Sequence, residues 1–250
     1  MVFRPYDPWL RHRDAGAMGK LTKPVPPVRR LLVVCAHPYD ATFALGGVIG
    51  AFTGAGTTVR ILCLTHGRRA DPSPRRRVDR ARDLGRAARH LGAEEMTLLD
   101  HAPGTLGRTA VDALADEVLA VADGVDALLT VDATGSGAHP DHVRAMRAAY
   151  RAAGKHGSVL YAWSLRATDP GSGRQVLVVD ADRDRQRAAI ACHTGLPADD
   201  PLRNRWLRHQ DRAERLIVLG GERILHPAAH AMLPARRPNT APAASPVPPG

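Results

Sequence analysis

The stretch Arg30-Leu-Leu-Val-Val-Cys-Ala-His-Pro-Tyr-Asp40 decides the fold of this chain. Its aliphatic run has no alternating polar positions, which is typical of a strand buried on both faces of a parallel sheet. His37 and Asp40 follow the run, at the carboxyl end of the strand, where open α/β sheets bind ligands. The stretch therefore predicts an α/β protein whose first strand leads directly into functional side chains.

A second stretch, Gly137-Ala-His-Pro-Asp-His142, repeats this arrangement. It follows an apolar run over 127–131 and precedes a helical pattern over 143–152, so His139 and His142 also lie between a strand and a helix. Two imidazoles and a carboxylate are a common ligand set of catalytic zinc and leave a position for water. From spacing and context alone, a metal site and ordinary polar caps both stay open.

Strand and helix patterns alternate along the chain. We predict strands over 31–36, 57–64, 96–99, 127–131, 158–164, 176–179 and 214–219, and helices over 41–55, 75–91, 111–121, 143–152 and 182–191. This alternation predicts a Rossmann-like, mostly parallel sheet with helices on both faces. A dinucleotide site does not follow, because Gly46-Gly47 lies inside the first helical pattern.

Length and composition fit one enzyme domain between two polar segments. The chain has 250 residues and 44% hydrophobic content, enough for a sizeable core. We predict an N-terminal arm over 1–27, an α/β domain over 28–233 and a disordered tail over 234–250, which is rich in Pro and Ala and lacks apolar periodicity.

Charge, aromatic content, apolar runs and cysteine content indicate which kinds of partner and location the chain has. The net charge of +10 could attract anions, but the Arg75-Arg-Arg77 run is typical of a solvated face, and 4% aromatic content does not favour nucleic acid. No apolar run reaches the roughly 20 residues of a membrane helix. The three widely spaced cysteines and the absence of a signal-peptide core favour a cytoplasmic protein. A homo-oligomer is compatible with the sequence.

The two histidine motifs resemble those of the PIG-L/LmbE family of zinc-dependent N-deacetylases, which are N-acetylglucosaminyl deacetylase-like enzymes. The resemblance covers approximately residues 30–219. The segments that carry it are Ala36-His-Pro-Tyr-Asp40, Leu45-Gly-Gly47, Leu64-Thr-His-Gly67, Arg80-x-x-Asp83, Ala87-Ala-x-x-Leu-Gly92, His139-Pro-Asp-His142 and Arg187-x-x-Ile-x-x-His193.

The resemblance implies a role for each residue of the two histidine motifs. His37, Asp40 and His142 would bind Zn²⁺, or another divalent metal. His139, oriented by Asp141, would stabilise an oxyanion or assist as an acid. A helix start after these residues suits that chemistry, because its dipole favours a developing negative charge.

Tyr39 departs from the family motif, which usually reads His-Pro-Asp-Asp and uses its first Asp as the general base. Such a base contributes about a hundredfold to ten-thousandfold in rate. The Tyr39 phenol would either donate a hydrogen bond to an oxyanion beside the metal or simply fill space. Arg80 and His193 would contact substrate, although His193 is equally well interpreted as a helix-terminal histidine.

The sequence thus predicts a zinc-dependent hydrolase that removes an N-acyl (acetyl) group from a small molecule. The substrate would be an amino sugar or a related natural-product or thiol-conjugate intermediate. Two alternatives stay open because the usual base is missing. One is a divergent family member in specialised metabolism that uses zinc and Tyr39 for a non-hydrolytic reaction, and the other is a non-catalytic binding protein.

Overall fold

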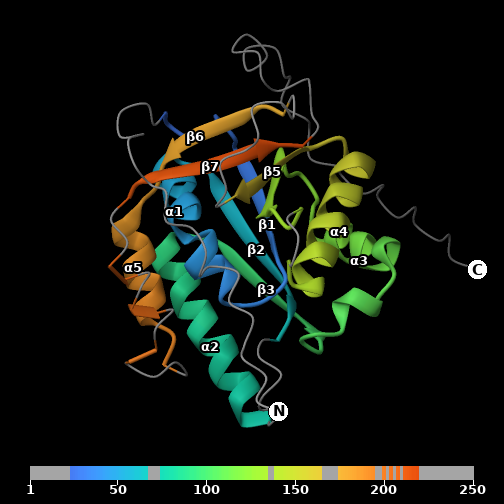
Figure 1. Cartoon of the computed structure of the whole chain (residues 1–250), viewed down its shortest axis with the longest axis horizontal. Coiled ribbons are helices and arrows are strands. Elements are labelled where there is room, and N and C mark those ends of the chain that lie inside the picture. Colours follow the sequence, from blue (N-terminus) through green and yellow to red (C-terminus); the bar gives the residue numbers. More distant parts are fainter. Residues whose placement is uncertain are drawn as a thin grey trace, which may run out of the picture.

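The protein is an α/β fold built on one seven-stranded sheet (Figure 1). The structure is a computed structural model, and it describes residues 23–66, 74–134, 138–164, 174–194, 199–200, 203–204, 207–208 and 211–219. The tail over 234–250 and most of the arm over 1–27 lie outside these residues. Within the described part of the arm, Lys23 forms an isolated parallel bridge with Val179.

The sheet has the strand order β3-β2-β1-β4-β5-β7-β6. Strands β3, β2, β1, β4 and β5 pair in parallel, whereas β7 runs antiparallel to both of its neighbours. The predicted mostly parallel sheet is therefore confirmed. The strand bounds are β1 Arg30–Cys35, β2 Thr58–Thr65, β3 Glu95–His101, β4 Ala127–Val131, β5 Val159–Ser164, β6 Val176–Asp180 and β7 Ala213–Val218.

Helices cover both faces of the sheet, as predicted. Alternate side chains of β1 enter two separate apolar clusters, with Leu31 and Val33 in one and Leu32 and Val34 in the other. The first cluster lies under α1 (Gly46–Gly54), α2 (Pro74–Leu91) and α5 (Arg183–Ala191), and the second under α3 (Val111–Ala120) and α4 (Pro140–His156) (Figure 1). Each fully buried aliphatic side chain contributes about 1.5–3 kcal/mol to this packing.

The segment after β1 differs from the single helix predicted over 41–55. It begins with a short π-helix, η1 (Asp40–Ala44), and α1 starts only at Gly46. The Leu45 N–H donates to the carbonyl of Asp40 at 2.9 Å, which closes a turn one residue wider than an α-turn. Turns of this kind occur frequently at functional sites, and this one carries Asp40.

Helix α4 begins at Pro140, three positions before the predicted start at Val143. Proline suits the first position of a helix, because an N–H there would have no partner within the helix. His139 caps this helix, and Asp182, the first residue of the helix predicted over 182–191, caps α5 by accepting the Arg185 N–H at 3.0 Å. A 3₁₀ turn, η2 (Leu106–Arg108), was not predicted.

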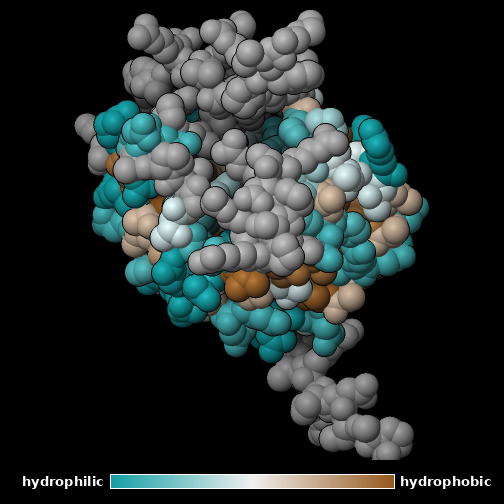
Figure 2. Space-filling view, turned by 90° about the horizontal axis from the view of Figure 1, so that it is seen from below, coloured by the Kyte–Doolittle hydropathy of each residue, from teal (hydrophilic) through white to brown (hydrophobic). Residues whose placement is uncertain are grey.

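The surface view agrees with a core that lies between the sheet and its helices. Hydrophilic residues cover most of the described surface in Figure 2, and a smaller apolar patch remains among them. None of the described helices has the length and apolar character to span a membrane.

The order of strands has a topological switch point between β1 and β4. Strands β2 and β3 lie on one side of this pair, and β5 lies on the other. Connections that leave neighbouring strands in opposite directions create a crevice at the carboxyl edge, where open α/β sheets bind ligands. His37 follows β1 and His139 follows β4, so the topology brings the two histidine motifs together.

Candidate metal centre

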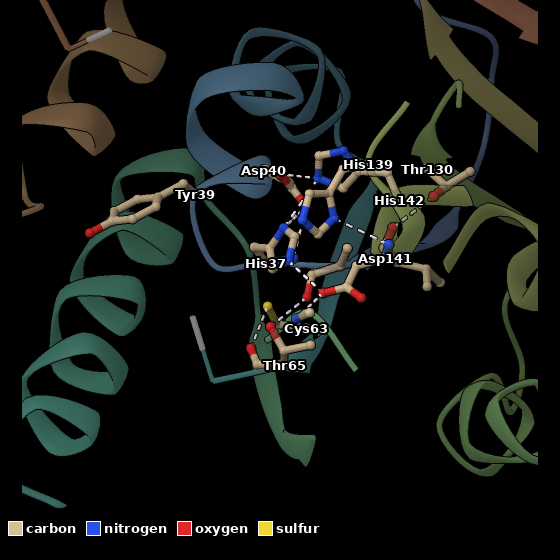
Figure 3. Close-up of polar contacts among 12 residues, drawn as sticks. His37, Tyr39, Asp40, Cys63, Thr65, Thr130, His139, Asp141 and His142 are labelled. Carbon is tan, nitrogen blue, oxygen red and sulfur yellow. Dashed lines mark hydrogen bonds and ion pairs between the residues drawn. The ribbon is translucent and has the colours of Figure 1, made fainter. Parts of the chain in front are cut away.

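His37, Asp40 and His142 converge at the switch point (Figure 3). The Nδ1 atom of His37 lies 3.2 Å from Nε2 of His142, which lies 3.1 Å from Oδ1 of Asp40. One nitrogen or oxygen atom from each of these residues lies within 4.8 Å of the other two. The structure therefore brings together the three residues predicted as metal ligands.

The orientation of His37 separates its two ring nitrogens. Its Nδ1 faces Asp40 and His142, whereas its Nε2 lies 3.0 Å from Oδ2 of Asp141. The backbone N–H of His37 also donates to Asp40 Oδ2 at 2.8 Å. His37 would thus offer Nδ1 to a metal and donate its Nε2–H to Asp141. An outer carboxylate of this kind fixes the ring and increases its basicity as a ligand.

Asp141 was expected to orient His139, but its carboxylate contacts other groups. It accepts from His37 and from the Gly104 N–H at 2.6 Å, and these contacts outweigh burial and lower the pKa of Asp141. Its buried Oδ1 has no hydrogen-bond partner among the described residues. The Gly104 contact was not predicted, because Ala102-Pro-Gly104 signals a turn without showing what its N–H groups bind.

His139 receives a hydrogen bond from the backbone of Asp141 instead. As the N-cap of α4 it accepts the Asp141 N–H at Nδ1, at 3.2 Å, which places the proton of a neutral ring on Nε2. Burial and the neighbouring His37 and His142 lower the pKa of His139, against the opposing effect of the carboxylates. His139 therefore offers an Nε2–H donor at a helix N-terminus, where negative charge is stabilised.

The donor set fits a zinc ion. Burial alone would raise the pKa of Asp40, but the charge and hydrogen bond of His142, together with His37, lower it to about 2, so this carboxylate is ionised. Burial alone would lower the pKa of His142, and Asp40 raises it instead. Two imidazoles and one ionised carboxylate are a suitable ligand set for zinc. Because zinc binds the neutral form of imidazole, its binding would displace any proton held by His142.

Tyr39 points away from the cluster (Figure 3). Its ring packs edge-on against Phe43, with centroids 5.8 Å apart, and against His193 at 4.8 Å. Successive side chains of a helical turn point in different directions, so directing Asp40 towards His142 turns the preceding residue away. Of the two interpretations of Tyr39, the packing agrees with the space-filling one, and a role of the phenol in the chemistry stays a prediction.

His193 lies inside the protein rather than at a substrate surface. It is 3% exposed, its Nε2 lies 2.8 Å from Oγ1 of Thr42, and its ring stacks on Phe43. Burial lowers the pKa of His193 to about 4, so the ring is neutral at neutral pH. This geometry favours a packing role between α5 and η1 over the predicted substrate contact.

Arg80 ties α2 to the residue that follows β2. Its Nε donates to the carbonyl of His66 at 2.9 Å, at the same edge of the sheet as the histidine cluster. Its contact with substrate stays a prediction. Gly67, which ends the Leu64-Thr-His-Gly67 segment, lies outside the described residues.

The chain is similar to known deacetylases in sequence. Residues 32–153 match the family model PIG-L, GlcNAc-PI de-N-acetylase. The chain is 31% identical over 157 residues to the 1D-myo-inositol 2-acetamido-2-deoxy-alpha-D-glucopyranoside deacetylase of Streptomyces griseus, in an alignment that covers 51% of this chain and 49% of that protein. The chain thus spans about half the length of the curated relatives it matches.

Solved structures share the fold. The zinc-inhibited form of teicoplanin deacetylase Orf2 matches with a TM-score of 0.57 and 17% identity, over 76% of this chain and 97% of that chain. GalB, the 4-carboxy-2-hydroxymuconate hydratase of Pseudomonas putida KT2440, matches with a TM-score of 0.54 and 20% identity, over 77% of this chain and 96% of that chain. The family match and the relative together show that residues 32–153 of this chain belong to the PIG-L/LmbE-like de-N-acetylase family, and the solved structures share its fold.

Proposed function

We propose that this protein is a zinc-dependent hydrolase that removes an N-acetyl group from an amino sugar or a related natural-product or thiol-conjugate intermediate. The observation that supports this most is the convergence of His37, Asp40 and His142 beside the Nε2–H donor of His139. The activity that gives the Streptomyces griseus relative its name, deacetylation of an acetamido sugar joined to inositol, agrees with this substrate class.

Each residue of the cluster has a distinct task in this reaction. His37, Asp40 and His142 would hold zinc, which when bound supplies Lewis acidity and lowers the pKa of water to about 7. His139 would donate its Nε2–H to the acyl oxygen as negative charge develops there. Position 39 has no carboxylate, so the proton released by water would go to another group. Asp141 is the candidate within the cluster, because its Oδ1 has no hydrogen-bond partner among the described residues, whereas both nitrogens of a neutral His139 ring are already engaged.

Acetate release tests this proposal directly. The zinc-loaded protein would be given the acetamido-glucosyl inositol and simpler N-acetylglucosamine derivatives, and acetate and free amine would be measured in equal amounts. Removing zinc with a chelator should stop the release. His139→Ala should lower kcat by about a hundredfold or more while zinc stays bound, since one oxyanion donor is worth that much.

His90→Ala is the matched control for His139→Ala, because His90 is an exposed histidine of α2. It should behave like the wild-type protein. Equal acetate release by the wild-type and His139→Ala proteins, or release that survives zinc removal, would contradict the proposal.

A second candidate is a non-hydrolytic reaction at the same residues. Tyr39 provides no carboxylate where the family resemblance implies the base, and the hydratase GalB shares the fold. Product analysis separates the two reactions, because a non-hydrolytic reaction releases no carboxylic acid. Tight substrate binding without any turnover would instead favour a non-catalytic binding protein, and amidase activity gained by Tyr39→Asp would show that only the base had been lost.

A further inference from the structure

The π-helix η1 is held by a side chain from a distant part of the chain. The Nε2 atom of Gln186, in α5, lies 3.0 Å from the carbonyl oxygens of both Thr42 and Phe43. These carbonyls lie at the junction of η1 and α1, where the turn changes from π to α and backbone acceptors need partners outside the helix. Gln186 thus fixes the segment that begins with Asp40.

The orientation of the Gln186 amide is itself fixed. The side chain is buried, at 2% exposure, and its Oε1 accepts from Nη1 of Arg183 at 2.5 Å. With its oxygen directed to Arg183, the amide must direct both N–H groups towards η1. One residue therefore satisfies two carbonyls of the π-helix and an arginine donor.

Arg183 is held in turn by the antiparallel part of the sheet. Its Nη2 donates to Oε1 of Glu214 at 2.6 Å, and its Nε donates to the carbonyl of Asp211 at 2.6 Å. The second oxygen of Glu214 accepts the indole N–H of Trp163 at 2.7 Å. A buried ion pair requires such complete hydrogen bonding, because an unpaired buried charge is costly. The network therefore runs from β5 and β7 through α5 to η1.

The Gly46-Gly47 pair makes room for this network. A Cβ atom on Gly47 would lie 2.9 Å from Nη1 of Arg183 and 3.1 Å from Oε1 of Gln186. On Gly46 it would lie 3.0 Å from Cγ of Gln186. Any larger side chain at these positions would push α5 away from η1, so the small residues allow the polar groups to reach the π-helix.

We propose that Gln186, held by Arg183 and Glu214, is a positioning residue that sets the place of Asp40 in the metal site. The inference rests on the proposed zinc site. All three residues lie outside the segment 32–153 that matches the family model. Without the Gln186 donors, η1 loses its anchor and Asp40 is less well ordered for binding. His37 is held by its contact with Asp141, and His142 lies in α4.

Gln186→Met tests the proposal, because it keeps the length of the side chain and removes both donors. Zinc affinity, measured by competition with a chelator, should fall by up to about tenfold to a hundredfold, the range for removing groups that orient metal ligands. In the metal-free protein, the Leu45 N–H that bonds to Asp40 should exchange faster with solvent. Gln186→Glu is a second variant, which keeps an acceptor for Arg183 and should show the same defects.

Ile190→Val is the matched control, because it makes a small core deletion in the same helix without removing a polar group. It should lower thermal stability and leave zinc affinity within about twofold of the wild-type value. Wild-type zinc affinity and unchanged Leu45 exchange in both Gln186 variants would overturn the proposal. So would an affinity loss in Ile190→Val equal to that in Gln186→Met.

The outcome separates this inference from the proposed function. If the wild-type protein binds no zinc, the zinc-dependent function fails. Exchange at Leu45 in the metal-free protein still decides the positioning role, because faster exchange in Gln186→Met supports it and unchanged exchange contradicts it.

Discussion

The Nε2 atom of His142 lies 3.1 Å from Oδ1 of Asp40, although the two residues are 102 positions apart in the chain. Asp40 opens the π-helix after β1, and His142 lies in the first turn of α4, which follows β4. Their contact exists because β1 and β4 are parallel neighbours at the switch point of the sheet. Sheet topology therefore assembles this site from two separate sequence motifs.

Asp141→Asn should weaken zinc binding about tenfold to a hundredfold. The Asp141 carboxylate accepts from Nε2 of His37 and so directs Nδ1 towards Asp40 and His142. The measurement is zinc affinity by chelator competition. Asp132→Asn is the control, because that carboxylate accepts from Thr134 and Ser164. Equal affinities of Asp141→Asn and the wild-type protein would show that the contact with His37 has no role in binding.

Tyr39→Phe should leave zinc content unchanged and keep kcat within about twofold of the wild-type value. Removal of an oxyanion donor would instead lower kcat by about a hundredfold or more. The phenol points away from the cluster, and the ring keeps its packing on Phe43 and His193. Steady-state kinetics of the zinc-loaded variant provide the test. A hundredfold loss in kcat with an unaltered thermal unfolding midpoint would show that the phenol takes part in the reaction.

His193→Gln should make stability less sensitive to acid. Burial lowers the pKa of His193 from 6.5 to about 4. Between these two values the unfolded chain binds a proton at His193 that the folded protein does not bind. This contribution to stability is complete above pH 6.5 and is lost as the pH falls towards 4. Between pH 7 and 5 it amounts to about 1–2 kcal/mol.

The measurement is urea unfolding of both metal-free proteins at pH 7 and pH 5. Glutamine can still bond to the hydroxyl of Thr42 but does not titrate, and every other titrating group is common to both proteins. The wild-type protein should lose more free energy of unfolding than His193→Gln over this interval. The same loss in both proteins would show that His193 does not resist protonation in the folded state.

Gly47→Ala should destabilise the protein by about 1–3 kcal/mol. The new methyl group would lie 2.9 Å from Cβ of Ala181 and 2.9 Å from Nη1 of Arg183. Gly154→Ala in α4 is the control, because nothing lies within 4 Å of its added Cβ, and it should stabilise by about 0.5–1 kcal/mol. Thermal unfolding measures both changes. An unfolding midpoint for Gly47→Ala above that of the wild-type protein would show that α5 shifts to accommodate the methyl group at little energetic cost.

The sequence predicted the fold well because most elements depend on local patterns. The apolar run of β4 was predicted over 127–131, where the structure has it, and the helix predicted over 182–191 is present as α5 with Asp182 as its cap. The π-helix was missed, because 41–55 is a continuous helical pattern and the wider turn is stabilised by contacts from Gln186, far along the chain.

The candidate site was predictable in its residues but not in its contacts. Spacing after two strands pointed to His37, Asp40, His139 and His142 as candidates, and the family resemblance implied that His37, Asp40 and His142 are the ligands. Which nitrogen of His37 faces the metal depends on Asp141, whose carboxylate direction depends on the turn at Gly104. Tertiary contacts of this kind leave no periodic signal in the sequence, so the direction of the Tyr39 side chain was equally open.

Zinc content of the purified protein, measured by elemental analysis, tests the central claim most directly. We expect one zinc ion per chain in the wild-type protein and its loss in His37→Ala and His142→Ala, with His90→Ala as the exposed-histidine control that retains it. No bound zinc after reconstitution of the wild-type protein, or the same zinc content in the His37→Ala, His142→Ala and wild-type proteins, would contradict the assignment of this metal centre.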